Sequence, residues 1–255
     1  MKKIKIAISL NQSLLDIVDT KIDGSIIRSR SQAIEHFLTQ GLKEEFINYG
    51  VIFLKGEHQK YAITEIKGKL LIQHHFDLLE SVGINNVFIV TQHNKYSDEL
   101  QKEVSKSKLN VKIIEKDARG TGGALFSIKE LLGNNDFIAL SGDILNKFDL
   151  RHMIKKHLEF KKIATMGLVS RLDTELRGTA VLDGDLIIDF KEKVKDTESN
   201  IVNAGIYVFS HQVFTYMDKD TISLESDLFP KLAYLKQIVG FFTHGEFQDM
   251  EELQQ

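Results

Sequence analysis

Hydrophobic and polar residues alternate one by one at the start of the chain, and after residue 11 the apolar positions recur at helical spacing instead. Strict alternation is typical of a β-strand, whose apolar face consists here of Ile4, Ile6, Ile8 and Leu10. Apolar residues three and four apart then predict two helices, over residues 14–22 and 33–42, separated by Asp23-Gly24. A single strand can neither pair its backbone nor bury its apolar face, so we expect two copies of the chain to pair here.

From residue 51 onward, short apolar runs alternate with longer stretches of helical spacing. The runs predict buried strands over residues 51–54, 87–91, 111–114 and 137–140, and the intervening patterns predict helices over residues 70–82, 96–105 and 124–132. Such alternation implies a parallel sheet covered on both faces. Asp183-Gly184, between two apolar runs, predicts a hairpin. The predicted fold is α/β, a mostly parallel Rossmann-like sheet with a small antiparallel addition.

The chemistry concentrates between Arg119 and Asp143. Glycines on both sides of Thr121 let the backbone approach a ligand closely, and they open a helix whose N-terminal amides favour anions. Asp143 comes just past the strand at residues 137–140, at the sheet edge where open α/β folds bind ligands. A carboxylate in that place suits a hard divalent cation such as Mg²⁺. The alternative interpretation is a common glycine turn followed by an Asp that only caps a helix.

Composition and charge narrow the class of protein. The chain has 255 residues, a net charge of -3 and no cysteine, so disulfides and thiolate metal sites are excluded. The lack of cysteine makes the cytoplasm the expected location. No apolar run approaches membrane-spanning length, and we expect no membrane partner.

The segment from Gly120 to Leu125, followed by Ser141-Gly142-Asp143, resembles the sugar nucleotidyltransferases, which make nucleotide-sugars from a nucleoside triphosphate and a sugar phosphate. The likeness continues to the C-terminus and implies a nucleotidyltransferase-like domain over residues 46–255. By resemblance, Mg²⁺ would be held with the nucleotide by Asp143 and Asp249. The nucleotide or nucleotide-sugar would contact Gly120, Thr121, Gly122, Gly178, Glu192, Lys193, Asn203 and Gly205.

The loop after the first strand of this domain departs from the family. The family carries a long glycine-rich loop with an Arg, then a Pro-Lys pair. The segment at residues 55–61 is several residues shorter, has one glycine, and lacks both the Arg and the Pro-Lys pair. Lys60 lies beside the position expected for the lysine and is the candidate catalytic substitute, while Glu57 adds negative charge where phosphates should bind. Since phosphoryl chemistry needs cations to neutralise developing charge, this loop predicts weak or absent catalysis.

The first 45 residues, with their strand, helix and helix, resemble a ribbon-helix-helix domain of the MetJ/Arc type. The resemblance implies a small separate domain over residues 1–45 that forms a homodimer through its strand and binds double-stranded DNA. Lys3, Lys5 and Ala7 would face base edges, and the amides around Arg30 and Ser31 would hold a phosphate. The alternative is a dimerisation module alone.

Two functions follow from these features. The first is a dimeric, sequence-specific DNA-binding transcriptional regulator whose nucleotidyltransferase-like domain senses a nucleotide or nucleotide-sugar. The alternative is an active, metal-dependent sugar-phosphate nucleotidyltransferase that is dimerised by its N-terminal domain. The short loop without Arg favours the regulator, whereas the retained Asp143, Asp249 and Glu192 indicate a persistent ligand pocket.

Overall fold

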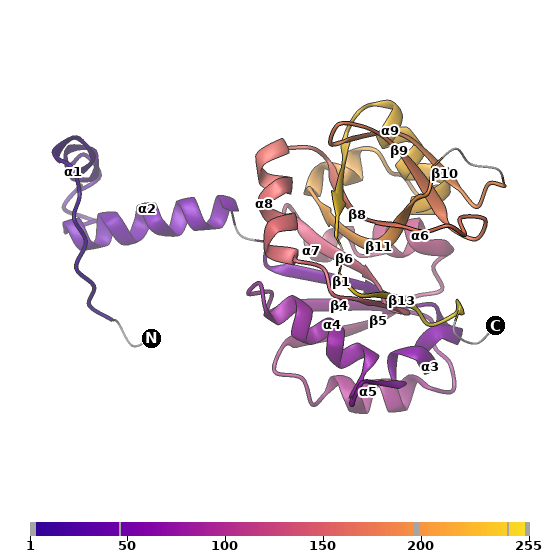
Figure 1. The fold of residues 1–255 in the computed structure, drawn as a ribbon. Helices are drawn as coiled ribbons and strands as arrows, with labels where there is room; N and C mark the ends of the chain where they lie inside the picture. The colour runs from indigo at the N-terminus through magenta and orange to yellow at the C-terminus, as the bar shows by residue number, and fades with distance from the viewer. Residues whose placement is uncertain (1–3, 46, 196–198, 244, 253–255) are drawn as a thin grey trace. The chain divides into compact units, whose positions relative to one another are not determined.

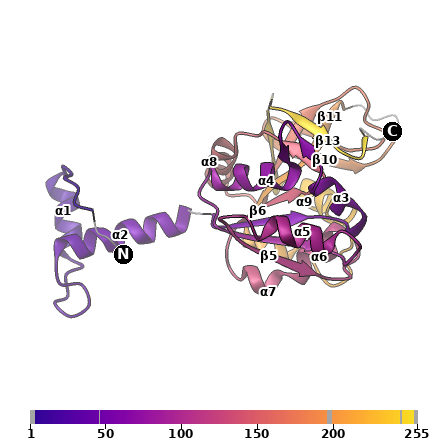
Figure 2. The same ribbon diagram turned by 90° about the horizontal axis from the view of Figure 1, so that it is seen from below.

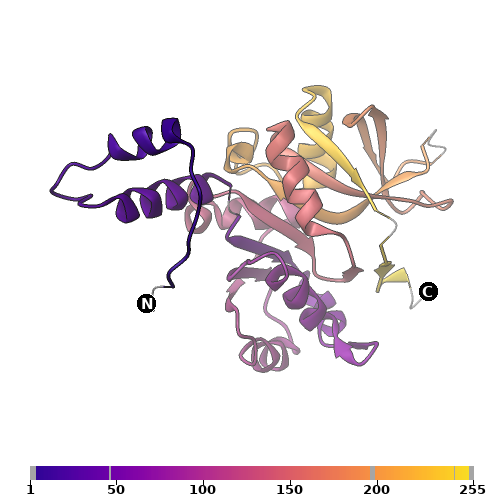
Figure 3. The same ribbon diagram turned by 60° about the vertical axis from the view of Figure 1, so that its left-hand side comes forward.

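The computed structural model describes residues 4–45, 47–195, 199–243 and 245–252. The chain divides into two compact units, residues 1–46 and 47–255, and each is described by itself. The first unit contains the two predicted helices, α1 (Gln12–Asp19) and α2 (Arg30–Glu45). Asn11 caps α1 by accepting a hydrogen bond from the amide of Leu14. Gly24, with φ +74°, makes the break between the helices, which Figure 3 shows clearly.

The predicted N-terminal strand is not formed in the described residues 4–10, which run without regular structure. Ile4 is 83% exposed and Ile6 is 74% exposed, because among the described residues of the first unit no strand pairs with this segment. Lys5 and Ala7 are exposed in the same stretch, and Lys3 lies outside the described residues. The Arg30 guanidinium pairs with the Asp19 carboxylate, with both contacts at 2.7 Å.

A nine-stranded sheet forms the centre of the second unit (Figure 1). The order across it is β5-β4-β1-β6-β11-β8-β12-β10-β9. The first four strands in that order are mutually parallel: β5 (Asn110–Glu115), β4 (Asn86–Thr91), β1 (Tyr49–Phe53) and β6 (Phe137–Ser141). The others are β11 (Ile201–Phe209), β8 (Ala164–Ser170), β12 (Ile238–Phe242), β10 (Leu186–Glu192) and β9 (Gly178–Asp183).

The sheet is mixed, which corrects the prediction of a mostly parallel Rossmann-like sheet with a small antiparallel addition. β11 enters the middle of the sheet and runs antiparallel to β6 on one side and to β8 on the other. Its residues are almost all buried, as in a central parallel strand. Because an apolar run buried on both faces carries no mark of direction, the sequence pattern could not distinguish the two arrangements.

Helices cover both faces of the sheet because successive strand residues point to opposite sides. In β1, Val51 and Phe53 belong to one core, and Ile52 belongs to the other. Figure 2 views the unit from the side that carries α4 and α5. The helices of the Ile52 core are α4 (Leu71–Glu80), α5 (Ser97–Val104) and α8 (Leu150–Phe160), and those of the opposite core are α6 (Gly120–Ser127), α7 (Lys129–Leu132) and α9 (Phe229–Tyr234).

Short elements surround the carboxyl ends of the parallel strands. The segment after β1 folds into a 3₁₀ turn, η1 (Gly56–His58), then α3 (Gln59–Ala62) and a small hairpin of β2 (Glu65–Ile66) and β3 (Lys69–Leu70). A second small ladder joins β7 (Ile144–Asn146) to β13 (Phe247–Asp249). The remaining turns are η2 (His211–Thr215) and the π-helical η3 (Leu224–Leu228). Among the described residues, no helix is long and apolar enough to cross a membrane.

Strand register decides which loops meet. Phe53 at the end of β1 is level with Val90 of β4 and with Ser141 of β6. Three loops therefore leave the same edge of the sheet side by side, and this is the edge where open α/β sheets bind ligands.

Candidate active site

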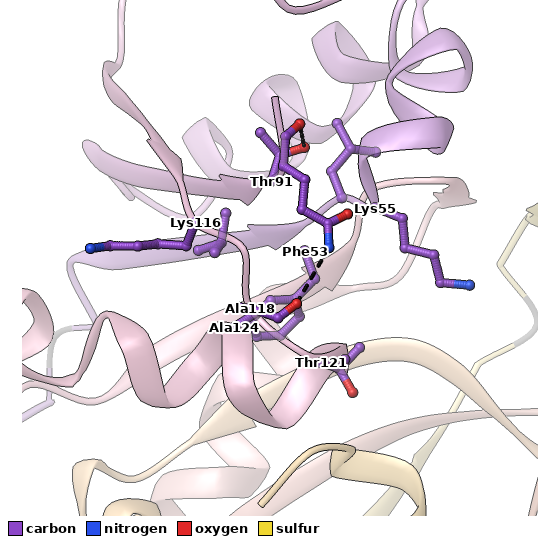
Figure 4. Close-up of a pocket in the computed structure, with 11 residues that line it drawn as sticks. Phe53, Lys55, Thr91, Lys116, Ala118, Thr121 and Ala124 are labelled. Atoms are coloured by element: carbon purple, nitrogen blue, oxygen red, sulfur yellow. Dashed lines mark hydrogen bonds between the residues drawn. The ribbon is translucent and has the colours of Figure 1, made fainter. Parts of the chain in front are cut away.

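A small cavity, with about 70 Å³ of space open to water, lies at this edge between the ends of β1 and β4 and the start of α6 (Figure 4). The Gln92 amide accepts from the backbone of Gly56 and donates to the carbonyl of Ala118, at 3.1 and 3.4 Å. The apolar lining with a few polar groups suits a planar heterocycle, and it comprises Phe53, Leu54, Val90, Ala118 and Ala124, with Lys55, Thr91, Gln92, Lys116, Gly120 and Thr121.

The glycine segment beside this cavity packs against the chain itself. The amides of Gly122 and Gly123 donate to the carbonyl of Ile222, at 2.8 and 3.2 Å. A Cβ on Gly120 would lie 2.4 Å from the same oxygen. The glycines thus make room for the backbone around Ile222. These two α6 amides, expected from the sequence to favour an anion, are occupied by a backbone carbonyl, and contact of Gly120 and Gly122 with a ligand stays a prediction.

Asp143 follows β6, and one histidine contacts its side chain while another contacts the next residue. The Nε2 of buried His75, on α4, donates to the carbonyl of Ile144 at 2.9 Å, and burial lowers the pKa of that histidine. His58 Nδ1 lies 2.6 Å from Asp143 Oδ2. The Asp143 side chain keeps 21% of its surface exposed, so it remains open to a ligand.

The antiparallel pairing of β7 and β13 brings Asp249 beside Asp143. Asp249 is level with Ile144, and the amide of Met250 donates to the Asp143 carbonyl at 3.0 Å. Burial raises the pKa of Asp249, and the negative charge of Asp143 acts in the same direction. Two neighbouring carboxylates repel each other, and a divalent cation bound between them would relieve that repulsion. The backbones of the two residues named as metal ligands by resemblance are therefore neighbours.

A second polar cluster lies on β9, β10 and β11. Asn203 Nδ2 donates to the hydroxyl of Tyr207 at 2.7 Å, and its Oδ1 accepts from the amide of Gly205 at 3.0 Å. Glu192 is level with Gly178, where a Cβ would lie 2.6 Å from Glu192 Oε2. These predicted sugar-binding residues thus form one cluster, with Gly178 leaving space for the carboxylate.

Glu192 is the electrostatically unusual member of this cluster. Burial, followed by the negative charge of Glu225, raises its pKa to about 7. Its Oε2 is buried and finds no hydrogen-bond partner among the described residues. Burial likewise raises the pKa of the neighbouring Tyr207 hydroxyl well above its ordinary value. A buried acceptor without a partner is a place for a ligand hydroxyl.

The two predicted lysines differ in their surroundings. Lys193 is exposed, and its amide donates to the carbonyl of Arg177 at 3.0 Å. The Lys60 ammonium lies over the ring of Tyr61, 4.7 Å from its centroid. Glu57 is 76% exposed at its side chain, in the same turn as His58. The loop therefore folds into compact helical turns and retains one candidate cation beside the expected position.

His58 is the site residue that the sequence did not single out. It lies five residues past the end of β1, and Asp143 lies two residues past the end of β6. Because β1 and β6 are parallel neighbours, the register would have brought these two loops together. Knowledge of the strand order, which periodicity does not give, was the missing signal.

A mixed α/β sheet with a cavity, a carboxylate pair and a polar cluster along one edge defines a nucleotide-binding α/β protein. Residues 56–236, more than half of the chain, match the nucleotidyl transferase family, and the chain belongs to that family. It is 27% identical over 195 residues to the mannose-1-phosphate guanylyltransferase catalytic subunit beta of Danio rerio, covering 74% of this chain and 54% of that protein. The chain thus spans about half the length of that relative.

Two further similarities concern sequence and fold. The D-glycero-alpha-D-manno-heptose 1-phosphate guanylyltransferase of Aneurinibacillus thermoaerophilus is 28% identical over 191 residues, which are 74% of this chain and 82% of that protein. A UDP-glucose pyrophosphorylase complexed with UDP-glucose has a TM-score of 0.68 at 19% sequence identity, covering 82% of this chain and 95% of that one. The second likeness concerns the fold alone.

The relatives correct the first of the two functions expected from the sequence. They are enzymes named for sugar-phosphate substrates, so the interpretation as a DNA-binding transcriptional regulator is wrong, and the alternative fits better. The family match does not extend to residues 1–45, and the ribbon-helix-helix domain is not confirmed. Double-stranded DNA as a partner is unsupported, as is a homodimer formed through the unstructured residues 4–10. The DNA contacts expected of Lys3, Lys5, Ala7, Arg30 and Ser31 are withdrawn with it.

Proposed function

We propose that this chain is a metal-dependent sugar-phosphate nucleotidyltransferase domain. It transfers a nucleotidyl group from a nucleoside triphosphate to a sugar phosphate and releases pyrophosphate. The nucleobase enters the cavity of Figure 4, and the sugar is bound by the cluster around Glu192 and Asn203. The names of the guanylyltransferase relatives support this class of reaction. The base and the sugar that this chain binds are identified by the experiment below.

One observation carries the proposal: a hydrogen bond joins the cavity to Glu225, the carboxylate whose charge acts on the sugar cluster. Thr121, which lines the cavity, donates from its hydroxyl to Glu225 Oε2 at 2.6 Å. Glu225 in turn is the nearby charge that helps raise the pKa of Glu192. The two ends of a nucleotide-sugar would therefore bind to parts of one connected network. A fold kept only as a scaffold has no need of that connection.

The chemistry joins a phosphate oxygen of the sugar phosphate to the α-phosphorus of the triphosphate. As that bond forms, the bond from the α-phosphorus to the bridging oxygen breaks, and pyrophosphate leaves with the electron pair. Asp143 and Asp249 would hold a divalent cation such as Mg²⁺, which supplies neutralisation of the phosphate charge. The Glu192 carboxyl and the Asn203 amide would orient the sugar, so that its phosphate faces the cavity.

Turnover is expected to be slow. The loop after β1 lacks the Arg and the Pro-Lys pair of the family, and Lys60 is the candidate cation beside the expected position. Loss of a single group that stabilises transition-state charge costs on the order of 100- to 1,000-fold in rate. Substrate binding depends on other residues and should be retained better than rate.

The test is pyrophosphate release from each nucleoside triphosphate paired with each of several sugar 1-phosphates, in the presence of Mg²⁺ or Mn²⁺. Release that requires both substrates and the metal supports the proposal. Absence of release for every pair, at enzyme concentrations high enough to detect one turnover per hour, would overturn it.

A further inference from the structure

Nucleotidyl transfer as proposed above leaves the imidazole of His58 without a role. His58 ends η1 and is only 4% exposed, although it sits in the turn that replaces the family's glycine-rich loop. Its Nδ1 contacts Asp143 Oδ2 at 2.6 Å, and its ring meets the edge of Tyr61 with centroids 5.2 Å apart. Packing therefore fixes a nitrogen donor against the carboxylate that is the candidate cation ligand.

Glu251 supplies a third group from the segment after β13. Donor atoms of His58, Asp143 and Glu251 all lie within 4.8 Å of one another. Across the described residues, no other three side chains of the metal-binding types come as close. Glu251 is exposed, so its carboxylate can move toward the other two without disturbing the core.

The spacing of the three groups suits one metal ion. Ligands bonded to a transition metal at about 2.0–2.2 Å lie roughly 3.0–3.5 Å apart when they are neighbours in its coordination sphere. The contact between His58 and Asp143 is a little shorter than this, and Glu251 lies within 4.8 Å of both. A rotation of the partly exposed Asp143 and a shift of Glu251 would bring all three into that range.

We propose that His58, Asp143 and Glu251 form a mixed nitrogen–oxygen site that selects a transition-metal dication, of the Mn²⁺, Co²⁺ and Zn²⁺ class, over Mg²⁺. Imidazole binds such ions well, whereas Mg²⁺ prefers oxygen ligands alone. The site shares Asp143 with the proposed nucleotidyltransferase centre, and in that respect it rests on the proposed function. Binding of the ion itself requires no nucleotide.

The experiment uses the full chain without a polyhistidine tag and without nucleotide. Co²⁺ is added while its visible d–d absorption is recorded, and calorimetry compares Co²⁺, Zn²⁺, Mn²⁺ and Mg²⁺. We expect one equivalent of Co²⁺ to bind with a saturable absorption change, and Mg²⁺ to bind at least 100-fold more weakly. His58→Gln should lower Co²⁺ affinity by about 100-fold, and Glu251→Gln should lower it by a smaller factor. Both variants should leave Mg²⁺ affinity within about threefold.

The chain offers a matched control in His152 and Asp149. Their Nδ1 and Oδ2 atoms are also 2.6 Å apart, but the pair is exposed at the start of α8 and has no described third ligand at the spacing of the candidate site. His152→Gln should leave the Co²⁺ signal unchanged. Wild-type affinity in His58→Gln, or equal binding of Co²⁺ and Mg²⁺ by the wild type, would overturn the inference. If His58→Gln fails to fold, Glu251→Gln still tests the site, because Glu251 is exposed and its substitution should not disturb the fold.

The outcomes separate this inference from the proposed function. Pyrophosphate release with Mg²⁺ and no preference for Co²⁺ would refute only the nitrogen-containing site. Selective Co²⁺ binding without pyrophosphate release from any substrate pair would refute only the nucleotidyl transfer.

Discussion

The two ends of the candidate site are built differently. At the sugar end, direct hydrogen bonds join Asn203 to Tyr207 and Thr121 to Glu225, near the partly buried carboxyl group of Glu192. At the phosphate end, carboxylates and the imidazole of His58 gather, and the family's phosphate-binding loop is replaced by short helical turns. The side chains that would recognise the sugar are thus already in place, whereas neutralisation of the phosphate charge depends on a bound cation and on Lys60.

Asp143→Asn should have the largest effect, because it removes the carboxylate at the centre of the phosphate end. Turnover is expected to fall by on the order of 100- to 1,000-fold, whereas the fold is retained because the side chain is partly exposed. Pyrophosphate release and thermal unfolding measure the two quantities. Asp77→Asn is the control, since Asp77 on α4 is an exposed carboxylate paired with Lys69 of β3. Equal loss in both variants would contradict a special role for Asp143.

Two adjacent glycines offer a sharper comparison within α6. A Cβ on Gly122 would lie 2.9 Å from the Ile222 backbone, whereas the nearest atom to a Cβ on Gly123 is 3.9 Å away. Gly122→Ala should lower the free energy of unfolding by about 1–3 kcal/mol. Gly123→Ala should be neutral, or should raise it by up to about 1 kcal/mol because alanine favours the helix. Chemical denaturation measures both, and equal losses would show that the Ile222 contact is unimportant.

The raised pKa of Glu192 predicts a pH-dependent stability. Since the folded-state pKa is about 7 and the ordinary value is 4.5, folding favours the protonated carboxyl. That contribution is complete below about pH 4.5 and is lost as the pH rises toward 7. Glu192→Gln should remove this pH dependence. At pH 8 its free energy of unfolding should exceed that of the wild type by on the order of 1–2 kcal/mol, after allowance for solvent screening. Chemical denaturation at several pH values measures the free energy of unfolding of both proteins. The prediction is wrong if this free energy changes with pH in the same way in both.

Lys60→Ala should have the smallest effect on turnover, a decrease of about three- to tenfold, or roughly 0.7–1.4 kcal/mol. Its ammonium already lies over Tyr61 and would reach a phosphate by leaving that ring. Lys95→Ala is a matched control, because Lys95 lies over the ring of Tyr96 at 5.0 Å in the loop before α5. Steady-state kinetics measures turnover in both variants. Equal turnover in Lys60→Ala and Lys95→Ala would contradict a role for Lys60.

Local patterns predicted the elements of the second unit well. The strand over residues 87–91 corresponds to β4, the Asp183-Gly184 turn joins β9 to β10, and the helix expected after residue 70 is α4. These features depend on neighbours in sequence, such as periodicity, caps and turns. Alternation over residues 4–10 was less informative, because a strand also needs a partner that a single chain does not provide.

The missed features all depend on contacts between distant segments. The direction of β11, the Ile222 carbonyl on α6 and the His58–Asp143 contact are set by how segments far apart in the sequence align. The pairing of Asp143 with Asp249 was expected only through family resemblance, since the β7–β13 ladder that creates it has three residues per strand. Ladders that short give almost no periodic signal.

The most direct test of the proposed nucleotidyl transfer is to follow the complete reaction by phosphorus NMR. Wild-type protein is incubated with the best nucleoside triphosphate, a sugar 1-phosphate and a divalent cation, beside Asp143→Asn. If the proposed reaction occurs, a nucleotide-sugar and pyrophosphate appear in equal amounts, both require the cation, and both are lost in the variant. Hydrolysis of the triphosphate without incorporation of sugar, or equal product from the variant, would contradict it.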